Sequence, residues 1–157
     1  MLKLGQEAPS FEVVASNGHT IKLADYRGKK NVVLFFYPKD FTRVCTAEVC
    51  GFRDMYEDLV GKDTEVIGVS LDSDASHEKF ASKHNVPYPL VADKDKELAK
   101  KYEAVGRLGG VLGIAKRVTY LIDKSGKIVG AFDGTFDENP HLGGVRDAVA
   151  KIAASAP

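Results

Sequence analysis

The chain has 157 residues, the usual length of one domain, and residues 1–157 are expected to form a single domain. Its 22 basic residues balance 22 acidic ones, which argues against nucleic acid or an anionic membrane as a partner. The chain opens without a signal-peptide pattern, and no apolar run could span a bilayer, so a cytoplasmic location is expected. In a reducing compartment, two nearby cysteines are more often catalytic or metal-binding than structural.

The first third of the chain predicts a β-hairpin followed by a buried strand. Apolar and polar residues alternate on either side of the turn signal Asn17-Gly18, over residues 11–14 and 20–23. Residues 32–37 are continuously apolar, which is typical of a central strand buried on both faces.

Helices and strands alternate in the rest of the chain. The predicted elements are a helix over about 46–59, a strand over 65–71, a helix over 73–84, a strand over 90–92 and a charged surface helix over 93–102. They are followed by a glycine-rich loop over 105–115, antiparallel strands over 117–123 and 128–132, and a helix over 141–154. This order predicts an α/β fold in which helices flank a central mixed sheet.

Both cysteines, Cys45 and Cys50, lie in the turn and helix that follow the buried strand. A thiol reacts as its thiolate, and Cys45 at a helix start is near unpaired N–H groups that favour an anion. An arginine brought in from elsewhere in the chain would add a fixed positive charge. Reactive chemistry is therefore expected here.

No metal or other cofactor is expected. Zinc needs more ligands at fixed spacing than the two cysteines supply. The remaining candidate nitrogen ligands are scattered along the chain and are expected to be exposed surface histidines: His19, His77, His84 and His141.

The pattern Pro38-x-x-x-Thr42-x-x-Cys45 resembles the active-site motif of the peroxiredoxins. The longer string over residues 36–50 resembles the bacterioferritin-comigratory protein (PrxQ) branch, whose second cysteine stands at this spacing. Further matching segments lie near the start, middle and end of the chain, at residues 5–11, 66–70 and 117–123. The resemblance implies a thioredoxin-like fold and a thiol peroxidase for hydrogen peroxide and organic hydroperoxides.

The resemblance also implies roles for the two cysteines. Cys45 would be the peroxidatic cysteine, which attacks the peroxide and becomes a sulfenic acid. Cys50 would be the resolving cysteine, which condenses with it to a disulfide. Thioredoxin or a similar dithiol reductant would then reduce that disulfide, and the protein would act as a monomer.

Four further residues match functional positions of the family. Arg117 corresponds to the arginine that stabilises the thiolate and the transferred oxygens, and Thr42 to the hydroxyl that hydrogen-bonds them. Pro38 would pack over the site and limit water, and Glu48 would orient the arginine. Many members of the branch have Pro-Gly before the first cysteine, whereas this chain has Arg43-Val44.

Helix geometry adds an inference that does not depend on the family. Cys45 and Cys50 are five residues apart, and residues at that spacing on an α-helix have Cα atoms about 8.6 Å apart. A disulfide requires a Cα–Cα distance of at most about 6.8 Å. We therefore expect the first turns of the helix to unwind in each cycle, and Gly51, a poor helix former, lies where unwinding is useful.

Two other functions are compatible with a cysteine pair. A general thiol–disulfide oxidoreductase would prefer Cys-x-x-Cys, which this chain lacks. A non-enzymatic redox sensor or holdase would use the cysteine switch to expose apolar surface, but no partner motif indicates one.

Overall fold

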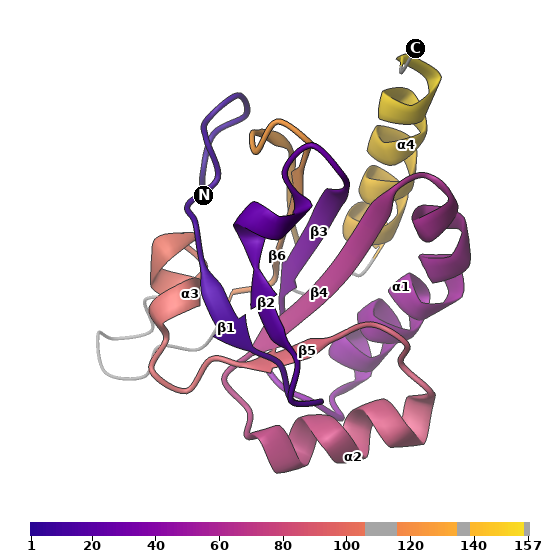
Figure 1. Cartoon of the computed structure of the whole chain (residues 1–157). Coiled ribbons are helices and arrows are strands. Elements are labelled where there is room, and N and C mark those ends of the chain that lie inside the picture. The colour runs from indigo at the N-terminus through magenta and orange to yellow at the C-terminus, as the bar shows by residue number, and fades with distance from the viewer. Residues whose placement is uncertain (106–115, 135–138, 156–157) are drawn as a thin grey trace.

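A five-stranded mixed sheet forms the centre of the molecule (Figure 1). The computed structural model describes residues 1–134 apart from 106–115, and residues 139–155. The strands of the sheet are β3 (Asn31–Phe36), β4 (Thr64–Ser70), β5 (Leu90–Ala92), β6 (Val118–Ile122) and β7 (Ile128–Asp133). Their spatial order is β5-β4-β3-β6-β7, with β3, β4 and β5 parallel and β6 and β7 antiparallel to their neighbours. The predicted mixed sheet is confirmed.

The central strand is β3, and all six of its residues are buried. It pairs with β4 on one side and β6 on the other, so both its edges are hydrogen-bonded and both its faces are covered. This environment explains why its sequence is continuously apolar rather than alternating. The turn over residues 37–42, which carries Pro38 and Thr42, leaves the sheet from the end of this strand.

Helices and a separate hairpin cover the two faces of the sheet (Figure 1). The helices are α1 (Arg43–Gly61), α2 (Asp74–His84), α3 (Glu97–Lys101) and α4 (Asn139–Ser155). Helices α1 and α4 pack on one face, in a core that also includes Phe80 of α2. The other face is covered by α3 and by the predicted hairpin, β1 (Glu12–Val14) and β2 (Thr20–Lys22), which runs into a 3-10 turn, η1 (Leu23–Tyr26).

Two predicted helices differ most from the structure in their bounds. Helix α1 begins three residues before the predicted start, so Cys45 lies inside its first turn. The charged helix predicted over 93–102 is shorter than predicted, although most of its charged side chains are exposed, as expected. It begins at Glu97 because Lys96 has left-handed backbone angles, and the Asp93 carboxylate accepts hydrogen bonds from the N–H groups of Leu98 and Ala99, which are buried.

Most of the glycine-rich loop, residues 106–115, lies outside the described residues. In the part of the chain that the structure describes, no helix is both long enough and apolar enough to cross a membrane.

Candidate active site

Cys45 lies in the first turn of α1 and is fully buried against the sheet. The residue before the helix, Thr42, makes no side-chain capping bond. The first N–H groups of a helix have no partner within the helix, and here no side-chain cap from Thr42 competes for them. The thiol of Cys45 is therefore next to backbone donors that favour a negative charge.

Arg117 supplies a positive charge to the same sulfur. Its Nη2 donates to Cys45 Sγ at 3.0 Å, and the residue is only 5% exposed. The sheet accounts for this meeting of residues 72 apart in the chain. Arg117 directly precedes β6, and Val118 at the start of β6 pairs with Phe36 at the end of β3, where the active-site turn begins. A buried guanidinium at this distance stabilises a thiolate.

Glu48 is one helical turn after Cys45 and is also fully buried. Its Oε1 is 3.4 Å from Nη1 of Arg117, so the guanidinium lies between a carboxylate and the sulfur. Burial of a carboxylate is costly unless a cation or donors accompany it. Here the guanidinium of Arg117 is the cation beside the buried Glu48.

His141, at the start of α4, belongs to the same buried cluster, and its predicted exposure was wrong. Its Nε2 is 3.2 Å from the Gly134 carbonyl, which can only accept, and its Nδ1 is 2.7 Å from the Thr119 hydroxyl, which can donate. Nε2 therefore donates to Gly134, and Nδ1 and the Thr119 hydroxyl form the second hydrogen bond. The Nδ1 atom is also 3.5 Å from Glu48 Oε2, so His141 packs behind the carboxylate that faces Arg117.

The second cysteine has a different environment. Cys50 is half-buried, and both cysteines are free thiols. Burial raises the pKa of the Cys50 thiol, the guanidinium of Arg53 opposes that effect, and the Asp54 carboxylate adds to it. At neutral pH, Cys50 is therefore a protonated thiol, and the structure distinguishes the two sulfurs chemically.

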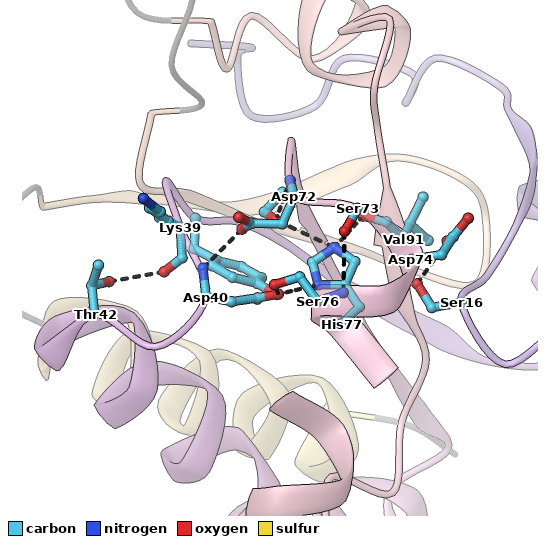
Figure 2. Close-up of polar contacts among 12 residues, drawn as sticks. Ser16, Lys39, Asp40, Thr42, Asp72, Ser73, Asp74, Ser76, His77 and Val91 are labelled. Atoms are coloured by element: carbon cyan, nitrogen blue, oxygen red, sulfur yellow. Dashed lines mark hydrogen bonds and ion pairs between the residues drawn. The ribbon is translucent and has the colours of Figure 1, made fainter. Parts of the chain in front are cut away.

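The turn between β3 and α1 carries the other motif residues. Thr42 is exposed, and its hydroxyl donates to the Lys39 carbonyl at 2.8 Å rather than to Cys45 (Figure 2). Pro38 is half-buried at the start of the turn. Phe41 has a left-handed φ of 64°, a conformation that a non-glycine residue adopts at a cost. Contacts from outside the turn must hold it in this shape.

Asp40 in this turn and His77 on α2 are both buried, which corrects the prediction that His77 is exposed. The two side chains form an ion pair with His77 Nδ1 2.8 Å from Asp40 Oδ2. Burial alone would raise the pKa of Asp40, but hydrogen bonds from His77, Tyr37 and Ser76 outweigh it and lower that pKa below 3.8. Asp40 is thus ionised at neutral pH.

Sequence reasoning missed both buried histidines, although a signal was present. His141 stands four and eight residues before the core positions Val145 and Val149, and His77 stands three before Phe80. Each therefore lies on the inward row of its helix. Among the described residues, no group of three His, Cys, Asp or Glu side chains could hold a metal ion.

Comparison with known proteins places this site in a family. The AhpC/TSA family profile matches residues 4–131. Peroxiredoxin Bcp of Bacillus subtilis is 43% identical over 132 residues, which cover 82% of this chain and 83% of that protein. The chain is a peroxiredoxin of the AhpC/TSA family.

Solved structures place this peroxiredoxin in the Bcp/PrxQ branch. Peroxidoxin BcpB of Mycobacterium tuberculosis superposes with a TM-score of 0.88 and 29% identity, covering 100% of both chains. Peroxiredoxin Q of Xanthomonas campestris gives a TM-score of 0.82 and 31% identity over 91% of both. The thioredoxin-like fold and a thiol peroxidase that acts on peroxides with a thiol reductant are therefore confirmed.

Proposed function

We propose that Cys45 is the peroxidatic residue of this peroxiredoxin. Its thiolate attacks one oxygen of a peroxide, the O–O bond breaks, and the other oxygen leaves as water or an alcohol after taking up a proton. The sulfur is oxidised to a sulfenic acid and the peroxide is reduced. The observation that carries this proposal is the 3.0 Å contact between Arg117 Nη2 and the buried Cys45 Sγ.

The surrounding groups have complementary roles in this proposal. Arg117 and the N–H groups at the start of α1 stabilise negative charge on the sulfur and on the leaving oxygen. Glu48 holds the guanidinium in place through the contact of 3.4 Å. Thr42 turns its hydroxyl from the Lys39 carbonyl to the peroxide when substrate binds, and Pro38 shields the site from water.

Cys50 is the proposed resolving residue. Its thiol attacks the Cys45 sulfenic acid, a disulfide forms and water leaves. Both cysteines lie within α1, so the helix spacing of about 8.6 Å between their Cα atoms keeps them out of disulfide range until α1 opens. Gly51 is required by packing in the structure, because a Cβ at this position would collide with the Leu142 side chain of α4.

We propose hydrogen peroxide and organic hydroperoxides as substrates and thioredoxin or a similar dithiol as reductant. One Xanthomonas campestris neighbour, with a TM-score of 0.83 and 27% identity, is described by its alkyl peroxide reduction activity.

The two core clusters share one sheet, which supports a single domain over 1–157. Among the described residues, the large exposed apolar side chains come from several different segments of the chain, which supports a monomer: Met1, Leu4, Val14, Phe41, Val60 and Val129. The cytoplasm remains the proposed location.

Replacing Cys50 tests the assignment of the two sulfurs. The Cys50→Ser variant is expected to consume about one equivalent of peroxide per chain and then stop, because its sulfenic acid has no internal partner. The wild type should turn over many times with thioredoxin. Peroxide consumption is measured with and without thioredoxin. Continued turnover of the variant at the wild-type rate would mean that Cys50 is not the resolving residue.

Arg43 is exposed at the first position of α1, where the helix dipole disfavours a positive charge. The Arg43→Gln change should stabilise the first turn by about 0.3–1 kcal/mol. Disulfide formation should then slow by about twofold to fivefold, because the helix must open first. The rate of disulfide formation is followed after one peroxide pulse, with Arg146→Gln on α4 as the control. A faster step in Arg43→Gln would contradict the role of helix opening.

A further inference from the structure

Four hydrogen bonds fix Asp40 of the active-site turn to its surroundings (Figure 2). Its Oδ1 accepts from the Tyr37 hydroxyl at 2.6 Å. Its Oδ2 accepts from Ser76 and from His77 Nδ1, each at 2.8 Å, both on α2. Its N–H donates to Asp72 Oδ2, also at 2.8 Å. Asp40 is 3% exposed, so helix α2 and Tyr37, the residue after β3, together hold this point of the turn.

The contacts of His77 assign its protonation state. Nδ1 faces the ionised carboxylate of Asp40 and must carry a hydrogen. Nε2 lies 3.1 Å from the Val91 carbonyl, which can only accept, and 3.2 Å from Ser70 Oγ. The Ser70 hydroxyl donates its hydrogen to Asp72 Oδ2 at 2.7 Å, so it too can only accept from the ring. Both nitrogens therefore donate, and His77 is a fully buried imidazolium.

A second contact from α2 reaches the same turn. The ring of Phe41 meets that of the buried Phe80 edge-on, with centroids 5.0 Å apart. Phe41 is the residue with the left-handed φ, and it lies between Asp40 and Thr42. Helix α2 thus holds the strained turn at two consecutive residues, immediately before the helix that carries Cys45.

We propose that His77 is a positioning residue for peroxide reduction: its buried imidazolium holds Asp40, and Asp40 fixes the turn from which Thr42 and Cys45 meet the peroxide. The assignment rests on the function proposed for Cys45. His77 does not touch the reacting atoms. It acts by keeping the turn in the geometry that the attack requires, and a misplacement of about 1 Å costs up to about a hundredfold in rate.

The test is the second-order rate constant for Cys45 oxidation by hydrogen peroxide, measured far below the melting temperature. His77→Asn keeps a donor near Asp40 but removes the charge and the second donor, and it should slow oxidation by about tenfold to a hundredfold. Asp40→Asn should have a similar effect, and the double variant should be no slower than either one. His84→Asn, on the same helix, should stay within about twofold of the wild type.

Ser76→Ala provides a milder variant in case His77→Asn does not fold. It removes one hydrogen bond to Asp40 from a half-buried position on α2 and should slow oxidation about threefold. A purely structural role predicts a lower melting temperature with an unchanged rate constant, and unchanged rates in the folded variants overturn the proposal. Wild type and Cys45→Ser are measured alongside. If oxidation does not depend on Cys45, the proposed function fails instead.

Discussion

Replacing Cys45 with serine is expected to abolish peroxide reduction, lowering the rate at least about a thousandfold. A serine hydroxyl is not ionised at neutral pH, so Arg117 and the start of α1 would have no anion to stabilise. The variant should also form no sulfenic acid and no disulfide. Peroxide consumption coupled to thioredoxin measures the first effect, and trapping of the sulfenic acid measures the second.

The Cys45→Ser change is nearly isosteric at a fully buried position, so its folding can be checked separately from its activity. Cys50→Ser is the matched control, because it removes the other thiol of the same helix and keeps the first oxidation step. Full activity in Cys45→Ser would remove the basis of the proposed mechanism.

Replacing Arg117 with methionine is expected to slow Cys45 oxidation by about a hundredfold to a thousandfold, as removal of a preorganised donor does elsewhere. The contact of 3.0 Å to the sulfur is lost, and Glu48 is left buried without its partner guanidinium. The sulfur then loses a donor that stabilises negative charge on it, and so does the leaving oxygen. Stopped-flow oxidation by hydrogen peroxide measures the change.

Two comparisons separate the charge of Arg117 from its shape. Arg117→Lys keeps a cation but loses the planar fork that reaches Cys45 and Glu48 together, so its rate should lie between those of the wild type and Arg117→Met. Lys116→Met removes an exposed charge next to it and should leave the rate within about twofold of the wild type. Equal rates for Arg117→Met and the wild type would mean that the guanidinium does not act on the sulfur.

Much of the fold could be predicted because hydrophobic periodicity records burial. The continuous apolar run of β3 and the four-residue and three-residue spacing along α1 correspond to a central strand and a core-facing helix row. The motif also predicted which residues the fold would bring together. Arg117 meets Cys45 across 72 residues because β6 pairs antiparallel with β3, a contact that no local pattern contains.

The features that were missed depend on tertiary contacts of polar groups. Histidines scattered along a sequence are expected at the surface, yet two of them are buried here because other groups supply their hydrogen bonds. Asp40 and Val91 are partners of His77, and Thr119 and Gly134 are partners of His141. The short α3 depends on Asp93, whose carboxylate accepts hydrogen bonds from the N–H groups of Leu98 and Ala99. These two residues follow Lys96, which has left-handed backbone angles. Such partners lie outside the sequence window that a periodicity argument uses.

Amide hydrogen exchange of residues 45–53 before and after oxidation tests most directly whether α1 opens during the catalytic cycle. Cys45 and Cys50 both lie inside the intact α1 of the reduced protein, so this segment must build the site and then open. We expect protected amides in the reduced protein and a loss of protection when the Cys45–Cys50 disulfide forms. Protection that stays the same in the oxidised protein would contradict it.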